Sequence, residues 1–230
     1  MSVLLQNWMV NRRWLGPALA LLALLGVPMA SAQTGPSAYD VVQGTTDRVM
    51  AVVEDANGYA DDDPERYFNE LQGVLDDVVD FAYFSRSVMG PYATRSRYQS
   101  LSPEGKQELR AQVDRFTEVM RTGLVRTYGK GLLAFGGSRV EIKRPDEPDL
   151  TSDRAEVTQL IYSDAPEPYV IEYQMRRDKK GKWRLRNLIV ETVNLGVIYR
   201  NQFQAAARDA EGDLNYVIDN WTAPSEQPGV

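Results

Sequence analysis

Apolar residues recur at steps of three and four over the segment from Ser102 to Phe135, with charged residues between them. This spacing places one apolar stripe along an α-helix. The stripe consists of Leu109, Val113, Phe116, Met120, Leu124, Tyr128 and Leu132. Ser102 followed by Pro103 is typical of a helix start, and the two glycines after Phe135 are typical of a helix end. The pattern predicts a helix of roughly 50 Å, which needs an apolar surface of similar length to cover it.

Further helices are predicted on both sides of this segment. Helical spacing covers Ala38–Asn57, Pro64–Leu75, Val74–Gly90, Val193–Asp209 and Gly212–Trp221. Asp63 precedes Pro64 and is expected to cap the second of these helices. The polar stretch Tyr92–Leu101 is expected to be a connection. The long helix is expected to bend or break at its internal glycines, which are Gly123, Gly129 and Gly131.

After Gly137 the apolar period changes from about 3.6 to 2, which is typical of strands. The expected strands are Arg139–Arg144, Arg154–Ser163, Tyr169–Arg176 and Trp183–Val190. Short connections, including a hairpin turn at Asp178–Gly181, indicate an antiparallel meander. Helices, then a sheet, then closing helices predict an α+β fold, with helices on one face of a curved sheet of about four strands. A long helix across such a sheet leaves room for an apolar cleft.

The first 32 residues have the organisation of a secretory signal peptide. Arg12 and Arg13 precede the apolar stretch Trp14–Pro28, and Ala30–Ala32 is a small-residue cleavage site. We expect cleavage after Ala32 and export as a soluble protein. The alternative is an uncleaved anchor, although the apolar run is shorter than the roughly 20 residues that a spanning helix needs.

The expected mature domain covers residues 33–222. It comprises a helical part at 38–135 and a sheet with closing helices at 138–221, and a flexible tail at 223–230 follows it. The full chain has a net charge of −6, and loss of the two leader arginines makes the mature chain more acidic. An acidic chain is a poor candidate for binding nucleic acid or for tight docking on an anionic membrane.

The chain contains no cysteine and no histidine, which excludes several kinds of chemistry. Disulfides, thiol nucleophiles, Ser-His-Asp triads and zinc sites with His or Cys ligands are ruled out. Asp76, Asp77 and Asp80 lie close together and are candidates for a paired-carboxylate acid/base site. The alternative is that these acids complement a helix dipole. No metal and no cofactor are expected.

Several short motifs occur together in a characteristic order. They are Val79-Asp80-Phe81, Phe84, Val88-Met89-Gly90, Ser102-Pro103-Glu104, Leu124–Tyr128, Leu132, Val193-Asn194-Leu195 and Tyr199–Phe203. Together with the leader, this set resembles the MlaC / Ttg2D (toluene tolerance) family of periplasmic phospholipid-binding proteins. The resemblance implies an NTF2-like sheet wrapped by helices, with a deep apolar pocket for acyl chains. It also implies a shuttle between an outer-membrane lipoprotein complex and an inner-membrane ABC transporter with an MCE-domain ring.

The chain departs from the family pattern at two places. The connection Tyr92–Leu101 is longer, so the pocket rim or a partner contact is expected to differ. Phe84 stands where a smaller aliphatic residue is expected, which would trim the pocket.

The candidate lipid-binding residues are apolar side chains of the predicted helices and strands. They are Phe81, Phe84, Val88, Phe116, Met120, Leu124, Tyr128, Leu132, Tyr169, Ile171, Tyr173, Met175, Trp183, Leu185, Tyr199 and Phe203. Such a lining suits a cargo whose burial is worth about 0.8 kcal/mol per methylene. For each of these residues the alternative is ordinary core packing. Arg126 and Arg200 are candidates for phosphate contact or, alternatively, for structural ion pairs.

Three functions from different classes remain open at this point. The first is a phospholipid carrier without catalytic turnover, whose bound lipid is cargo. The second is an NTF2-like isomerase-type enzyme that uses one of the three aspartates with a tyrosine. The third is a periplasmic chaperone or adaptor that binds peptides in an apolar groove.

Overall fold

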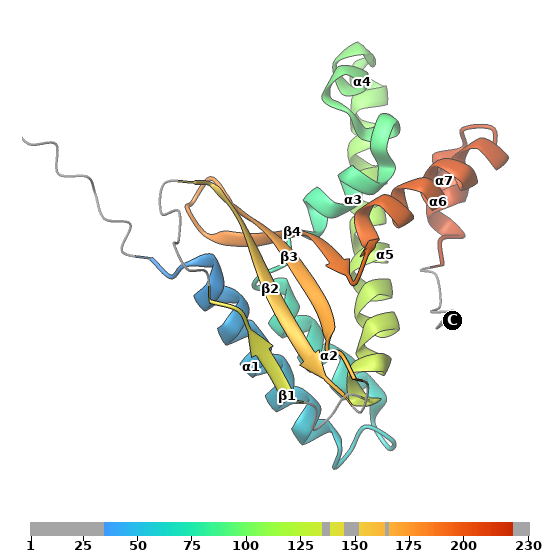
Figure 1. Ribbon diagram of the computed structural model, residues 1–230. Helices are drawn as coiled ribbons and strands as arrows, with labels where there is room; N and C mark the ends of the chain where they lie inside the picture. Colours follow the sequence, from blue (N-terminus) through green and yellow to red (C-terminus); the bar gives the residue numbers. More distant parts are fainter. Residues whose placement is uncertain (1–34, 135–138, 145–151, 164–165, 223–230) are drawn as a thin grey trace, which may run out of the picture. The chain divides into compact units, whose positions relative to one another are not determined.

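A computed structural model describes residues 35–134, 139–144, 152–163 and 166–222 (Figure 1). The expected signal peptide, its cleavage site and the C-terminal tail lie outside the described residues. The glycines expected to end the long helix lie outside them too.

The long helix α5 runs without interruption from Pro103 to Ala134, over 32 residues. The hydroxyl of Ser102 accepts a hydrogen bond from the Gly105 amide at 3.2 Å, so the expected start is confirmed. The expected break at an internal glycine is wrong, because the helix continues through all three of them. Gly129 instead allows close packing against α2, because a Cβ at this position would lie 3.0 Å from Leu71 Cδ2 and 3.2 Å from the ring of Phe68.

Within the described residues, seven further helical segments accompany α5. They are α1 (Ala38–Ala56), α2 (Pro64–Asp76), α3 (Phe81–Met89), the 3-10 turn η1 (Gly90–Ala93), α4 (Arg95–Ser100), α6 (Leu195–Asp209) and α7 (Leu214–Asp219). Asp63 caps α2 as expected, since its carboxylate accepts from the Arg66 amide at 3.1 Å. The expected connection Tyr92–Leu101 is mostly helical instead, because Thr94 caps α4 through a hydrogen bond from the Arg97 amide at 3.1 Å.

The single helix expected over Val74–Gly90 is wrong, because the chain leaves helical geometry between α2 and α3. Here Val79 pairs in parallel with Leu185 of the sheet. The Asp80 amide donates to the Leu185 carbonyl at 3.0 Å, and the Asp80 carboxylate caps α3 by accepting from the Tyr83 amide at 2.8 Å. The apolar spacing along Val74–Gly90 continues unchanged across this break. The spacing therefore does not reveal the pairing with a distant strand.

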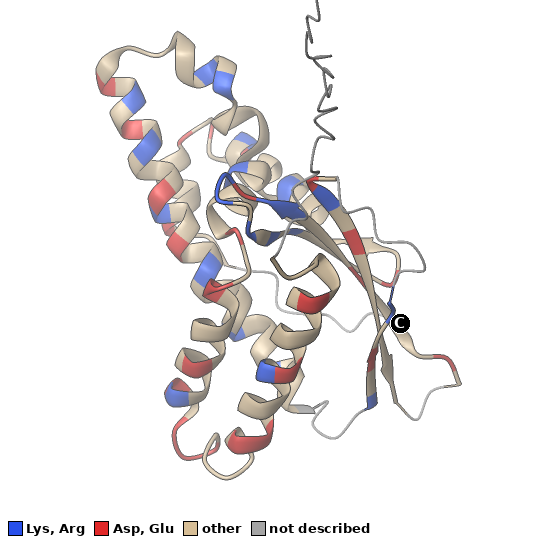
Figure 2. Ribbon diagram, turned by 90° about the vertical axis from the view of Figure 1, so that its left-hand side faces the viewer, with Lys and Arg blue, Asp and Glu red and all other residues tan. Residues whose placement is uncertain are grey.

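The sheet has five antiparallel strands in the order β1-β2-β3-β4-β5, which confirms the predicted meander and adds a short last strand. The strands are β1 (Arg139–Ile142), β2 (Arg154–Tyr162), β3 (Tyr169–Arg177), β4 (Trp183–Val190) and β5 (Val193–Asn194). Helices lie on one side of the sheet, as the predicted α+β arrangement requires (Figures 1 and 2).

A β-bulge in β4 determines which side chains of this strand face the helices. Gln174 pairs with Asn187, but the next residue, Met175, pairs with Leu185. Arg186 is therefore the extra residue, and the alternation of side chains shifts by one position across it. As a result Leu185 and Leu188 lie on the same face of the sheet, although an unbroken strand would place them on opposite faces.

Buried apolar side chains form three clusters. The helical cluster joins α3, α5, α6 and α7 and contains Phe84, Val88, Met89, Leu109, Phe116, Met120, Tyr199, Phe203, Ala207, Leu214, Val217 and Ile218. A second cluster joins α1 to the sheet through Val42, Val157, Met175 and Trp183, among others. A third joins α1 and α2 to α5 around Tyr67, whose hydroxyl donates to the Gly129 carbonyl at 2.8 Å. No helix in the described part of the chain has the length and apolar character that crossing a membrane requires.

Candidate functional site

Six of the predicted lipid-binding residues lie together inside the helical cluster. They are Phe84, Val88, Phe116, Met120, Tyr199 and Phe203. The rings of Phe116 and Phe203 lie 4.8 Å apart, and both side chains are fully buried. Leu124 packs against the border of this cluster. Aromatic and aliphatic groups of the protein surround these six side chains, which is the arrangement of a packed core.

The other predicted residues lie in different parts of the fold. Met175 and Trp183 are buried between the sheet and α1, with Tyr173 and Leu185 at the border of that cluster. Leu132 borders the third cluster. Phe81 is buried at the start of α3, and the hydroxyl of the half-buried Tyr128 lies 3.3 Å from that of Tyr199. The structure therefore does not collect the sixteen residues in one place, and their contact with lipid stays a prediction.

One face of the sheet combines apolar side chains with incomplete burial. Rows of paired residues run across β2, β3 and β4. In the row nearest α1, Val157 pairs with Tyr173, and Tyr173 pairs with Leu188. On the next row Ile171 is opposite Val190, which is opposite Val193. Directly paired residues point to the same side of a sheet, so these side chains share the face that packs on α1. We call the set Tyr169, Ile171, Tyr173, Leu188, Val190 and Val193 the open sheet face.

Burial declines steadily across this face. Val157 is 4% exposed under α1, whereas Tyr173, Leu188, Ile171 and Val190 are only half-buried. Tyr169 and Val193, at the far end, are 43% and 41% exposed. Partly exposed apolar side chains that lie side by side can mark a ligand-binding surface. The open sheet face can bury a further apolar group, and it is the candidate site.

Polar groups at the edge of the open sheet face are satisfied by the protein itself. The Tyr173 hydroxyl donates to Gln159 Oε1 at 2.6 Å, and Gln159 is buried. The hydroxyl of Thr46 in α1 lies 3.4 Å from the same oxygen. Burial raises the pKa of Tyr173 above its ordinary value, so this phenol stays neutral. This hydrogen bond fixes the position of the Tyr173 ring on the open sheet face.

Three residues of the open sheet face were not predicted as site residues, namely Leu188, Val190 and Val193. Leu188 and Val190 flank the equally apolar Ile189, so a period of two does not single them out as a pair. Their position beside Leu185 on one face depends on the bulge at Arg186, which the alternation alone does not reveal. Val193 lies in a strand of two residues, too short for a periodic signal.

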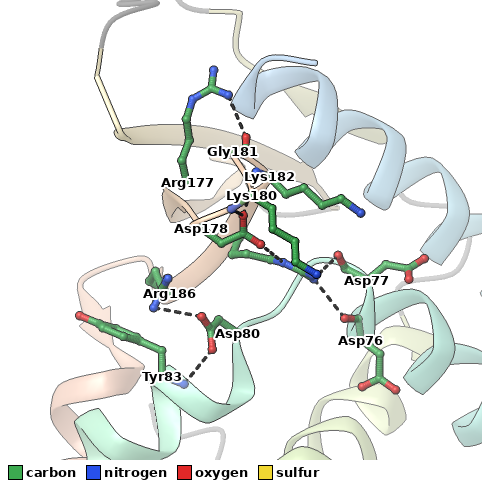
Figure 3. Close-up of polar contacts among 11 residues, drawn as sticks. Asp76, Asp77, Asp80, Tyr83, Arg177, Asp178, Lys180, Gly181, Lys182 and Arg186 are labelled. Atoms are coloured by element: carbon green, nitrogen blue, oxygen red, sulfur yellow. Dashed lines mark hydrogen bonds and ion pairs between the residues drawn. The ribbon is translucent and has the colours of Figure 1, made fainter. Parts of the chain in front are cut away.

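The three neighbouring aspartates do not form a paired-carboxylate site (Figure 3). Asp76 pairs with Arg121, Asp77 with Arg48 at 2.8 Å, and Asp80 with Arg186 at 3.0 Å. Hydrogen bonds from Arg121 hold the pKa of Asp76 below its ordinary value. A general acid needs the opposite shift, so this geometry offers no support for the aspartate-based enzyme hypothesis.

The two candidate phosphate ligands have structural roles. Arg126 forms a two-pronged ion pair with Glu65 of α2, at 2.8 and 2.6 Å. This interaction lowers the pKa of Glu65. Arg200 donates from Nε and one terminal nitrogen to the carbonyl and hydroxyl of Ser87, each at 2.8 Å. In the described residues, no group of three or more acidic side chains is placed to hold a metal ion.

Comparisons with known proteins agree on one family. The family model described as MlaC protein matches residues 43–223. A relative from Pseudomonas putida, toluene tolerance protein ttg2D, is 29% identical over 203 residues, which cover 88% of this chain and 86% of the relative.

A solved structure has the same fold. It is a phospholipid-binding protein from Ralstonia solanacearum in complex with a phospholipid, with a TM-score of 0.62 and 18% identity. The match covers 80% of this chain and 94% of that protein.

Proposed function

The chain belongs to the MlaC family, as its ordered motifs predict, and from this premise we propose that it is a periplasmic phospholipid carrier. It would shuttle phospholipid between the outer membrane and an inner-membrane ABC transporter. The proposed partners are an outer-membrane lipoprotein complex and the MCE-domain component of the transporter. The N-terminal leader would direct the chain to the periplasm, with cleavage after Ala32.

The open sheet face is the observation that carries this proposal. It offers aliphatic and aromatic surface on Ile171, Leu188 and Val190, which the protein's own side chains leave half-covered. Each methylene of an acyl chain that is buried there contributes about 0.8 kcal/mol, so a chain of ordinary length needs no polar recognition along it. The exposed Tyr169 and Val193 mark the end at which an acyl chain would enter.

Two groups among the sixteen predicted residues are proposed to have different roles. Tyr169, Ile171 and Tyr173 belong to the open sheet face and are proposed to contact lipid directly. The residues of the helical cluster, such as Phe116 and Phe203, are proposed to act mainly as core, because no side-chain surface of either is exposed. Tyr128 is half-buried, and its hydroxyl lies within hydrogen-bonding distance of the Tyr199 hydroxyl. We propose that it combines core packing with lipid contact.

Extraction of the purified mature protein with organic solvent tests the carrier function directly. Mass spectrometry of the extract is expected to find phospholipid in a fixed ratio to protein. Extracts without phospholipid, from protein produced in several bacterial hosts, would contradict the proposal.

A matched pair of substitutions on β3 tests the location of the site. Ile171→Asp places a charge on the open sheet face and is expected to remove most of the co-purified lipid, because an ionised carboxylate cannot be buried against hydrocarbon. Val170→Asp makes the same change at the half-buried neighbour on the opposite face and is expected to retain the lipid. Equal lipid content in the two folded variants would place the site elsewhere.

A further inference from the structure

A second surface feature is separate from the open sheet face. An open groove of about 810 Å³ lies where α3, η1, α4, α5 and α6 meet. Its apolar lining consists of Tyr83, Pro91, Ala93, Tyr98, Leu109 and Val113. None of these residues belongs to the open sheet face, so the groove is not explained by the carrier site.

The groove has a charge opposite to that of the whole protein. Arg86, Arg95, Arg110 and Arg200 line it with Asp114, a local formal charge of +3 in a chain whose net charge is −6. The first three arginines are exposed. Among the residues that the structure describes, none of the four arginines forms an ion pair. Their charge is therefore available to a ligand.

The fourth arginine is held in place by its surroundings. Two nitrogens of the half-buried Arg200 donate to Ser87 at the end of α3. Gly90 follows with φ of 56°, and a Cβ at this residue would lie 3.1 Å from Gln204 Nε2 and 3.5 Å from Arg200 Cγ. The close approach of α3 and α6 at Gly90 thus fixes Arg200 on the groove wall. A fixed guanidinium loses little conformational entropy when it binds a carboxylate.

We propose that this basic groove docks an acidic, amphipathic peptide segment of a partner protein. Apolar side chains of the segment would lie on Tyr98, Leu109 and Val113, and its carboxylates would reach the arginines of the wall. A lipid fits the groove less well, because a groove open to solvent does not give an acyl chain a dry enclosure. The proposal deepens the carrier role by naming the chemistry of a docking partner, but its test does not depend on bound lipid.

Fluorescence anisotropy with a synthetic probe tests this docking site. The probe is a dye-labelled heptapeptide in which Glu and Asp alternate with Leu and Phe, and the control peptide carries Lys in place of each acid. The acidic probe is expected to bind the full mature protein, more weakly as salt increases, because exposed charge pairs are screened. The basic peptide is expected not to bind.

A charge-reversal pair locates the binding. The double variant Arg86→Glu/Arg95→Glu is expected to bind the acidic probe about tenfold more weakly, since two favourable charge pairs become repulsive. The control Lys179→Glu/Lys180→Glu makes the same charge change in the exposed turn between β3 and β4 and is expected to bind like the unmodified protein. Circular dichroism melting of both variants verifies that they fold.

Two further measurements separate this proposal from its alternatives. Flotation with phosphatidylglycerol vesicles tests a membrane surface as the ligand, and solvent extraction tests whether the groove variant still carries lipid. Unchanged lipid content together with weaker probe binding supports the docking site. Equal probe binding by both double variants, or an effect confined to vesicles, would overturn it, whereas absence of lipid from the unmodified protein would overturn the carrier function alone.

Discussion

In the helical cluster, Phe116 and Phe203 have no exposed surface, whereas Ile171 and Val190 on the open sheet face keep part of theirs. Both regions are composed of aliphatic and aromatic residues, and some residues of each were selected from periodic apolar patterns. The difference lies in what packs on top. Four helices close over the first region, while α1 covers only one end of the second. Periodicity therefore identifies apolar faces, but the tertiary arrangement decides which of them is left for a ligand.

The largest expected effect is on the stability of the helical cluster. Phe203→Ala removes a fully buried ring that packs on Phe116 and Trp221, and we expect it to lower the free energy of unfolding by about 3–5 kcal/mol. Urea denaturation measures this change. The lipid content per folded molecule is expected to stay constant. A small loss of stability with a large loss of lipid would break the comparison, because the cluster would then be a ligand site.

A second prediction concerns how far tight packing extends along α5. Gly129→Val is expected to destabilise the protein by about 1–3 kcal/mol, because the new side chain collides with Leu71 and Phe68. Gly73→Val in α2 is the matched control, since a Cβ at Gly73 meets no atom within 4 Å. Thermal unfolding of the two variants is the measurement. If both unfold at the same temperature, α2 and α5 are less closely packed than the structure shows.

A smaller effect is expected on the open sheet face. Leu188→Ala removes a side chain that is only partly buried, so we expect the lipid-free protein to lose only about 1 kcal/mol. The lipid-loaded protein is expected to lose more, because ligand binding adds to the stability of the folded state. Denaturation before and after lipid removal measures the difference. Equal losses in the two states would separate Leu188 from the lipid site.

The smallest expected effect is a pH dependence from the polar contact between α2 and α5. The pKa of Asp76 is lowered in the folded protein by hydrogen bonds from Arg121. Its contribution to stability is therefore complete above the ordinary carboxyl pKa of 3.8 and is lost as the pH falls through the lower folded value. Arg121→Met is expected to weaken this dependence. The free energy of unfolding of both proteins is measured from pH 6 to pH 3, roughly the range in which aspartates titrate. Parallel curves for the unmodified protein and Arg121→Met would contradict the assigned role of Asp76.

Local sequence signals predicted the elements better than their contacts. The cap at Asp63, the long α5 and the antiparallel meander follow from residue types and spacing within one segment. The break at Asp80 did not, because it depends on pairing with Leu185, more than a hundred residues away. The glycines of α5 were misread for a related reason. Gly129 serves a neighbouring helix rather than a bend, and only the tertiary structure shows that neighbour.

The candidate site was predicted in part. Ile171 and Tyr173 were selected because β3 alternates regularly, and they lie on the open sheet face. Phe116 and Phe203 were selected on equally good periodicity but are core residues of the helical cluster. A stripe of apolar residues has the same appearance in the sequence whether its covering surface is protein or lipid, so burial in the folded chain was needed to separate the two groups.

The bulge at Arg186 gives β4 two halves whose side-chain alternation is out of phase. Substitution of Arg186 leaves that phase unchanged, even though it removes the ion pair with Asp80. Deletion of the residue would leave Leu188 two positions after Leu185, so a regular strand without the bulge would keep Leu188 and Val190 on the same face as Leu185. Loss of one codon at this position would thus preserve the apolar face of β4, so the phase of the strand tolerates both substitution and loss of residue 186.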